Sequence, residues 1–180
     1  MKIVSSAMVI VQIALLSSLS ATYAATITLN NTPAQVFFAP DDKCTGAIVK
    51  EINKAKSDIL VQAYSFTSEE TAAALIEAHK RGIRVEIILD KSNRSAKNSA
   101  GDLTARMGIP TYVDTRHAIA NNKVMIIDGE TLITGSYNFT KAAEERNAEN
   151  LLIIRNKDLA AIYRKNWEKH KEHAEKHWKR

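Results

Sequence analysis

The residues best suited to chemistry lie close together in one segment of the chain, residues 121–138. The residues of interest in this segment are two amides, an ammonium group, a carboxylate and a glycine–serine pair: Asn121, Lys123, Asp128, Gly135, Ser136 and Asn138. Ammonium, hydroxyl and amide groups can all donate hydrogen bonds to phosphate oxygens, and the ammonium group adds charge attraction. The segment therefore predicts a site for a phosphate-containing ligand.

A β-hairpin is expected to bring these side chains together. An apolar run, an Asp-Gly turn signal and a β-branched run follow one another at residues 124–127, 128–129 and 131–134. A turn centred on residues 129–130 would place Lys123 opposite Ser136 and Asn121 opposite Asn138. Because side chains two positions apart on a strand share a face, these four residues are predicted to form one patch.

The spacing resembles the HKD signature of the phospholipase D superfamily, His-x-Lys-x4-Asp-x6-Gly-Ser-x-Asn, at every position except the first. Asn121 stands where the family has histidine. Farther along, the sequences FTKAA at residues 139–143 and NAEN at residues 147–150 resemble the small secreted, plasmid-type nucleases of this superfamily. The resemblance extends over most of the chain after its N-terminal segment.

The resemblance implies a phosphodiesterase that works through a covalent phosphohistidine. In the family one histidine attacks phosphorus, a second protonates the leaving alkoxide, and water activated by the second then releases the product. Lysine and asparagine side chains from two motifs hold the phosphoryl oxygens, so no cofactor and no metal is implied. Because this chain carries one motif, the resemblance implies a homodimer in which Lys123, Ser136 and Asn138 face their copies across a two-fold axis.

Three further residues receive roles from the resemblance. Glu149 matches the acidic residue that orients the histidine in the family. Gly135 is expected to let the backbone approach the phosphate closely. Asp128 is expected to serve the turn and its surrounding hydrogen bonds rather than the reaction.

Asn121 alters what this site is expected to do. An amide donates and accepts hydrogen bonds, but it is neither basic nor nucleophilic near neutral pH. In a symmetric site this one change removes both the nucleophile and the general acid, and losing such a unit lowers the rate by many orders of magnitude. His117 is not expected to replace it, because four residues of extended strand span about 13 Å. The sequence predicts a chain that keeps its fold, its dimer and its affinity for anions, with little or no turnover.

Three functions follow as hypotheses. The first is a metal-independent endonuclease of low sequence specificity, in which Lys91, Arg94 and Lys97 of a basic loop join Lys123 along a DNA or RNA backbone. The second is a phospholipase D acting on phospholipid head groups, although the sequence contains no exposed amphipathic stretch suited to a membrane. The third, which Asn121 keeps open, is a non-catalytic nucleic-acid-binding dimer.

The N-terminal residues 1–24 are predicted to be a signal peptide, which indicates a periplasmic or secreted protein. Lys2 precedes an apolar run at residues 9–16, and the segment ends on Thr22-Tyr23-Ala24, a typical cleavage site. A membrane anchor is the alternative, but the apolar run is shorter than the ~20 residues a spanning helix needs.

Composition is compatible with one domain over residues 25–180 that binds an anionic partner. The chain has 25 Lys and Arg against 20 Asp and Glu, and removing the leader removes only Lys2, which leaves 24 − 20 = +4. This excess suits a polyanion without requiring one. The single cysteine, Cys44, is expected to be buried at a helix start, with an intermolecular bridge as the alternative.

The order of predicted elements indicates an α/β fold. Strands are expected at residues 36–38, 58–65, 84–89, 111–113, 124–127, 131–134 and 151–154, and helices at 45–56, 69–81, 104–107, 141–146 and 157–180, with a loop at 91–100. Strand, helix and strand in succession imply a right-handed parallel crossover. We therefore expect a mixed, mainly parallel sheet with helices on both faces. His170, His173 and His177 are interpreted as part of a solvated basic helix end rather than as metal ligands.

Overall fold

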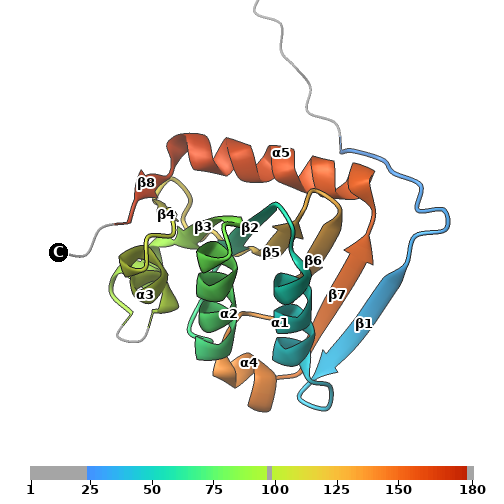
Figure 1. The fold of residues 1–180 in the computed structure, drawn as a ribbon, viewed down its shortest axis with the longest axis horizontal. Helices are drawn as coiled ribbons and strands as arrows, with labels where there is room; N and C mark the ends of the chain where they lie inside the picture. The colour runs from blue at the N-terminus through green and yellow to red at the C-terminus, as the bar shows by residue number, and fades with distance from the viewer. Residues whose placement is uncertain (1–23, 97–98, 178–180) are drawn as a thin grey trace, which may run out of the picture.

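The structure is a computed structural model, and it describes residues 24–96 and 99–177 (Figure 1). The strands are β1 (Ala34–Ala39), β2 (Asp58–Ala63), β3 (Arg84–Asp90), β4 (Thr111–Asp114), β5 (Lys123–Ile127), β6 (Thr131–Gly135), β7 (Glu149–Arg155) and β8 (Glu175–Lys176). The helices are α1 (Cys44–Lys54), α2 (Glu69–Lys80), α3 (Ala100–Arg106), α4 (Lys141–Glu145) and α5 (Lys157–His173), with a 3-10 turn, η1, at Lys91–Arg94. Almost all of the predicted signal peptide, residues 1–23, lies outside the described residues, so it stays a prediction.

The eight strands form one mixed sheet in the order β1-β7-β6-β5-β2-β3-β4-β8. β2, β3 and β4 run parallel to one another, and the other neighbouring strands are antiparallel. The predicted α/β class is confirmed. The predicted predominance of parallel pairing is wrong, because antiparallel neighbours rather than crossovers build the half of the sheet from β5 to β1.

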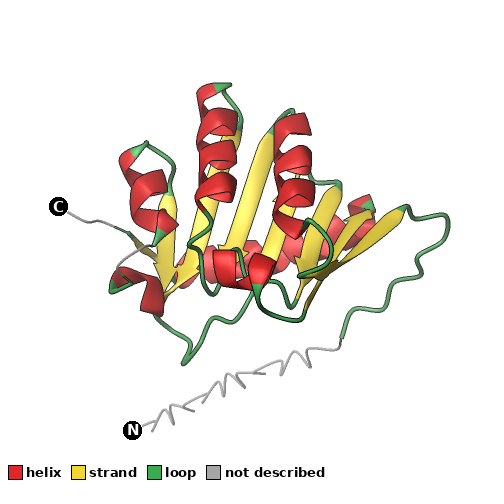
Figure 2. Ribbon diagram, turned by 90° about the horizontal axis from the view of Figure 1, so that it is seen from below, coloured by secondary structure: helices red, strands yellow, loops and turns green. Residues whose placement is uncertain are grey.

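Helices cover both faces of the sheet, as expected (Figure 2). The larger apolar cluster packs α1 and α2 against one face, and it includes the fully buried Cys44 predicted at a helix start. On the other face, Trp167 of α5 packs in a second cluster that includes Leu60 of β2 and Ile126 of β5. The indole N–H of Trp167 donates to the backbone carbonyl of Val61 at 2.9 Å. Every residue of β2 is buried, including the polar Asp58 and Gln62 beside its apolar residues.

Local signals set the ends of α2. The hydroxyl of Ser68 accepts a hydrogen bond from the backbone N–H of Thr71 at 3.2 Å, which satisfies one of the free N–H groups of the first turn. The helix stops at Lys80, and Gly82 follows with a φ of 87°. Only glycine adopts this conformation readily, so the chain can turn directly into β3.

The hairpin of β5 and β6 forms, but its predicted register is wrong by one residue. Ile127 pairs with Thr131 and Met125 with Ile133. Three residues make the turn, and two of them, Asp128 and Gly129, have positive φ angles of 55° and 63°. The additional turn residue displaces every pairing that was deduced from a two-residue turn.

A bulge follows at the end of β6. The backbone N–H groups of Ser136 and Tyr137 both donate to the carbonyl oxygen of Asn150, at 3.1 and 3.2 Å. Two residues of one strand thus oppose one residue of β7, an arrangement that redirects the side chains after it. The bulge, rather than a continuous ladder of paired residues, therefore sets the orientation of the Ser136 side chain.

The C-terminal segment departs from the predicted helix over residues 157–180. α5 ends at His173, and β8 then pairs with β4. Long-range contacts hold this strand: Glu175 accepts from Arg94 at 2.6 Å, and Nε2 of the buried His177 lies 2.6 Å from Asp102 Oδ1. Helical periodicity in the sequence does not reveal such distant partners, which is why the helix was predicted to continue beyond His173.

Two further details concern the surface. Ile162 of α5 is exposed although it is apolar, whereas Ala160, two residues earlier, is buried. The loop expected at residues 91–100 contains the 3-10 turn η1. Among the helices that the structure describes, none has the length and apolar character needed to cross a bilayer.

Candidate active site

Lys123 occupies the first position of β5, at the edge of the sheet where the parallel strands end. Its Cα pairs with that of Ala63, the last residue of β2. The Nζ atom donates to the backbone carbonyl of Asn121 at 3.2 Å and also to the side-chain oxygen of Asn121. The ammonium group lies 5.1 Å from the ring centroid of Tyr64, a distance suited to a cation–π contact. The residue predicted to bind phosphate is therefore held beside the residue at the family's histidine position.

The electrostatic surroundings of Lys123 include Glu149, the first residue of β7. Burial lowers the pKa of the Lys123 ammonium, while the Glu149 carboxylate opposes that shift. The structure thus brings two of the predicted site residues together across β5, β6 and β7.

Ser136 connects Glu149 to the bulge. Its hydroxyl donates to Glu149 Oε2 at 2.6 Å and accepts from the backbone N–H of Asn150 at 3.0 Å. Asn147 donates to the other oxygen of the same carboxylate at 3.0 Å. Glu149 is consequently held by two neutral donors, and it could orient a basic side chain placed at the site.

Asn138 lies just past the bulge, and its side-chain oxygen is incompletely satisfied. The Oδ1 atom is buried and has no hydrogen-bond partner among the described residues. A flip of the amide would turn its N–H donors toward the same position. This group can therefore accept a bond from a second protomer or, after the flip, donate one to a phosphate oxygen.

The structure gives Gly135 a role beside the predicted approach to phosphate, which stays a prediction. It has a φ of 146°, and a Cβ atom added there would lie 2.2 Å from the backbone oxygen of Asn150. The close neighbour is therefore β7, and the absence of a side chain lets the two strands meet at the bulge.

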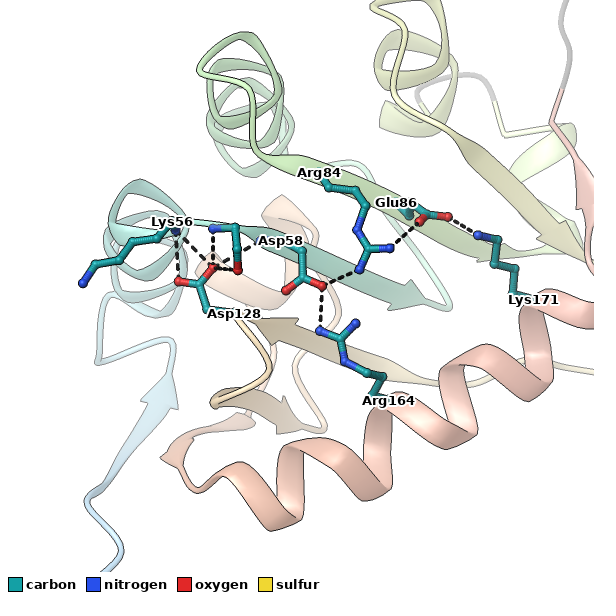
Figure 3. Close-up of polar contacts among 8 residues, drawn as sticks. Lys56, Asp58, Arg84, Glu86, Asp128, Arg164 and Lys171 are labelled. Atoms are coloured by element: carbon teal, nitrogen blue, oxygen red, sulfur yellow. Dashed lines mark hydrogen bonds and ion pairs between the residues drawn. The ribbon is translucent and has the colours of Figure 1, made fainter.

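Asp128 makes the hydrogen bonds around the turn that were expected of it (Figure 3). Its carboxylate accepts from the backbone N–H groups of Lys56, Ser57 and Asp58 at 2.8–3.2 Å, and from the Ser57 hydroxyl at 2.9 Å. Burial would raise the pKa of Asp128, but these hydrogen bonds outweigh it and the net shift is downward. Asp128 fixes the hairpin turn to the segment that enters β2, at the sheet edge remote from Lys123.

Ion pairs beside this turn attach α5 to the sheet (Figure 3). Asp58 Oδ2 lies 2.6 Å from Nη2 of both Arg84 and Arg164. One strand residue therefore joins β3 and the first half of α5, and Lys171 bonds to Glu86 near the other end of the helix. The helix is thus anchored along its length.

The basic segment after β3 reaches the site through Tyr64. The side chain of Asn93 in η1 donates to the Tyr64 carbonyl at 2.7 Å, and the Tyr64 N–H donates to the carbonyl of Asn122 at 2.7 Å. Lys91 is exposed, whereas Arg94 is paired with Glu175. Lys97 lies outside the described residues, so its predicted contact with nucleic acid stays a prediction.

Two groups beside the site were missed by the sequence analysis. Tyr64 follows a buried strand directly, and its place at the carboxyl edge of β2 is the signal that could have identified it. Tyr137 is buried, and its hydroxyl donates to Glu144 at 2.6 Å and lies 2.8 Å from the Thr45 hydroxyl. These contacts span α1, α4 and the bulge, and no local pattern in the sequence indicates them.

The arrangement can hold an anion, but it has no strong nucleophile at the motif position. Lys123 supplies positive charge, and Asn138 and Ser136 supply polar groups on the same edge. Asn121 supplies an amide, which can only donate and accept hydrogen bonds. The arrangement therefore offers a phosphate ester positive charge and hydrogen-bonding groups, while residue 121 offers it no nucleophile.

Three known proteins illustrate what the chain is similar to. A family model described as "Cardiolipin synthase, PLD-like domain" matches residues 48–171. A phospholipase D of Rickettsia conorii is 42% identical over 139 residues, which cover 77% of this chain and 70% of that protein. Nuc of Salmonella typhimurium, a phospholipase D family member, has a TM-score of 0.79 at 34% identity, over 82% of this chain and 99% of that one. NucT of Helicobacter pylori has a TM-score of 0.76 at 25% identity, over 81% and 99%.

Proposed function

The chain belongs to the phospholipase D superfamily of phosphodiesterases, and from this premise we propose that two protomers together bind a DNA or RNA backbone. The observation that carries the proposal is the gathering of Lys123, Ser136 and Glu149 at one sheet edge, with Asn138 following on the same chain. From each protomer the motif itself contributes one ammonium group, that of Lys123. Two such sets of residues, one from each protomer, would stabilise the several charged oxygens of a phosphoryl group better than one set would.

The reaction of this site type proceeds in two displacements. A histidine at position 121 would attack phosphorus, forming a P–N bond, while its copy from the second protomer protonates the departing ester oxygen. Water would then lose a proton to that second histidine as it breaks the P–N bond. The Lys123 side chains would stabilise charge on the phosphoryl oxygens, and Glu149 would orient the imidazole.

With Asn121 in place we propose that binding survives and turnover is lost or strongly impaired. The amide can form neither the P–N bond nor the imidazolium acid that the two steps require. Since both protomers carry the same residue, both roles are lost together, and the rate falls by orders of magnitude. The chain with Asn121 would therefore have the fold of a sequence-non-specific endonuclease and would bind nucleic acid without cutting it.

The nucleic-acid backbone is favoured as the ligand because its recognition requires positive charge rather than a pocket of defined shape. The chain carries a formal charge of +5, and Lys91 lies on η1, which is joined to the site through Tyr64. Contacts of this kind hold phosphates in register without reading bases. We propose a periplasmic or secreted location, on the basis of the predicted signal peptide.

A phospholipase is the second candidate, because the Rickettsia conorii relative bears that name. One feature of the structure is compatible with it: Ile119, two residues before Asn121, is an exposed apolar side chain. A single isoleucine is a small membrane contact, since interfacial binding grows with buried apolar area. The nucleic-acid proposal therefore remains first.

The test is the variant Asn121→His, assayed on plasmid DNA and on phosphatidylcholine vesicles in the presence of a chelator. The parent chain should retain plasmid without cutting it, and the variant should gain cleavage by orders of magnitude. Asn122→His is the matched control, because it adds the same imidazole one residue from the required position. Head-group release by Asn121→His without DNA cleavage would select the phospholipase, and equal cleavage by parent and variant would refute the role given to Asn121.

A further inference from the structure

Three histidines and an aspartate form a compact cluster at the carboxyl end of β4. Asp114 ends β4, His117 follows in the loop, and His170 and His173 lie on the last turn of α5. The C-terminal part of α5 passes over β4 (Figure 1). The prediction that the helix end is a solvated run of histidines is wrong, because His170 and His173 turn inward to Asp114 and their side chains are only 13% and 17% exposed.

The four side chains point their donor atoms at one another. Asp114 Oδ2 lies 2.7 Å from His170 Nδ1 and 2.9 Å from His117 Nδ1, and Asp114 Oδ1 lies 3.3 Å from His173 Nε2. The ring centroids of the three imidazoles are 4.9–5.5 Å apart. One ligand atom from each residue can be chosen so that all four lie within 4.8 Å of one another.

From this cluster we propose a zinc-binding site with three imidazole nitrogens and one carboxylate oxygen as ligands. Tetrahedral zinc holds ligand atoms at about 2.0–2.2 Å, so its ligands lie roughly 3.4 Å from one another. Each Asp114 oxygen already lies within that value of two of the three nitrogens: Oδ2 of His170 Nδ1 and His117 Nδ1, and Oδ1 of His117 Nδ1, at 3.1 Å, and His173 Nε2. The wider separations must close by an ångström or so, and His117 can supply this movement because its side chain is 44% exposed on a loop.

The hydrogen bonding of the cluster is incomplete without a cation. Asp114 has a fully buried side chain, and its carboxylate is the shared acceptor of the group. His173 Nε2 is buried and makes no hydrogen bond among the described residues, although it lies within ion-pair distance of Asp114. A zinc ion would take a lone pair from each imidazole and from the carboxylate. His173 Nε2 would gain the partner it lacks, and the Nδ1 atoms of His117 and His170 would exchange their bonds to Asp114 for bonds to the ion.

The spacing of the ligands suits a structural cross-link. Each pair, Asp114 with His117 and His170 with His173, is separated by two residues, and the pairs come from segments far apart in the chain. Four protein ligands complete a tetrahedral shell, as structural zinc sites do. The ion would fasten the end of α5 to the loop 115–122, which leads into the active-site residues Asn121 and Lys123.

The choice of zinc rests on ligand type. Imidazole nitrogen favours zinc and its neighbours in the transition series, whereas magnesium and calcium require oxygen ligands. This inference is independent of the phosphodiester chemistry, since the ion would serve the loop and not the phosphate. It would hold whether the chain binds DNA, lipid or neither.

The experiment uses the chain purified without a polyhistidine tag and stripped of metal with a chelator. Titration with Zn²⁺ by calorimetry, and metal analysis after dialysis, should give one ion per chain. Thermal unfolding should shift upward with added Zn²⁺, because a ligand of the folded state stabilises it. Co²⁺ in the same site should give the visible absorption of a tetrahedral complex, and excess Mg²⁺ should not compete.

Variants distinguish this site from adventitious binding. Replacing both His170 and His173 by Ala should abolish stoichiometric binding. His117→Ala, on the exposed loop, should lower affinity by at least the roughly 10- to 100-fold that loss of a second-sphere partner costs. His79→Ala on α2 is the control and should bind zinc like the parent. The proposal is overturned if the folded parent chain takes up no stoichiometric zinc, if Mg²⁺ competes equally, or if the His117→Ala variant binds as tightly as the His79→Ala control.

Discussion

The ammonium group of Lys123 donates a hydrogen bond to the backbone carbonyl of Asn121, 3.2 Å away, and a second bond to the side-chain oxygen of the same residue. The cation that we propose to bind phosphate and the residue at the family's histidine position are therefore in direct contact. An incoming phosphate would compete with Asn121 for Lys123. The amide thus gives the ammonium group a local partner while contributing no nucleophile.

The first prediction concerns Lys123→Ala, which should weaken retention of plasmid DNA. Each protomer would lose one contact to phosphate, so the slope of log affinity against log salt should become shallower by roughly 1 per protomer. Binding measured by fluorescence anisotropy at several salt concentrations tests this. Lys80→Ala at the end of α2, beside the opposite edge of the sheet, is the control. An unchanged slope for Lys123→Ala would remove Lys123 from the site.

The second prediction tests whether the site is shared by two protomers. If both histidines are required, one Asn121→His chain paired with one parent chain lacks either the nucleophile or the acid. In co-refolded mixtures the cleavage rate should follow the square of the fraction of Asn121→His chains. A strictly linear dependence would mean that each chain acts alone, and sedimentation of the same mixtures would report the dimer independently.

The third prediction concerns Asp128→Asn, which should destabilise the fold while leaving DNA binding nearly unchanged. The carboxylate accepts several backbone N–H bonds, and weakening this charged acceptor should cost about 1–3 kcal/mol of unfolding free energy. Urea unfolding measures the loss, with exposed Asp41→Asn as the control. A loss no larger than that of the control would show that the turn does not depend on the charge.

The stability that the Asp128 carboxylate contributes should depend on pH with a definite sign. The pKa of Asp128 is lowered in the folded chain, so its stabilisation is present above the unfolded value of about 3.9 and is lost as pH falls through the folded pKa. The difference between the parent and Asp128→Asn should therefore shrink below about pH 4. A difference that widened on acidification would contradict the downward shift.

The elements of this fold were predictable where local chemistry decides them. The strand predicted at residues 58–65 contains β2, and the helix predicted at residues 69–81 begins where α2 does, after the cap Ser68. The hairpin was also visible, but its register was not, because the additional turn residue depends on a positive φ at Asp128 that is stabilised from residues 56–58. A local signal identified the turn, and a distant contact set its geometry.

In the candidate site, too, local signals identified some residues and distant contacts decided the rest. The motif spacing identified Lys123 and Ser136, and the family resemblance identified Glu149; the structure brings the three to one edge. The histidine cluster was misread, because His170 and His173 look like a solvated helix end until β4 places Asp114 beneath them. Their buried environment is a property of tertiary packing, and helical periodicity carries no information about it.

The last prediction is that Gly135→Ala destabilises the chain more than an ordinary surface change. An added Cβ would lie 2.2 Å from the backbone oxygen of Asn150 and 3.0 Å from its Oδ1, at a φ of 146° that residues with side chains rarely adopt. Because one of the obstructing atoms is backbone, β6 and β7 must separate at the bulge. We expect a loss of roughly 2 kcal/mol or more in unfolding free energy, which is large for a single methyl group.

Gly46→Ala supplies the control for this prediction. Gly46 lies inside α1, and a Cβ there would meet only Lys43 Cβ at 3.8 Å, so alanine should stabilise the helix by about 0.5–1 kcal/mol. Opposite signs for the two glycine variants in urea unfolding are the expected result. If Gly135→Ala were as stable as the parent, the bulge would have to be more adaptable than its hydrogen bonds to Asn150 indicate. The close approach of β6 and β7 would then no longer fix the position of Ser136, or the orientation of the Glu149 carboxylate that bonds to it.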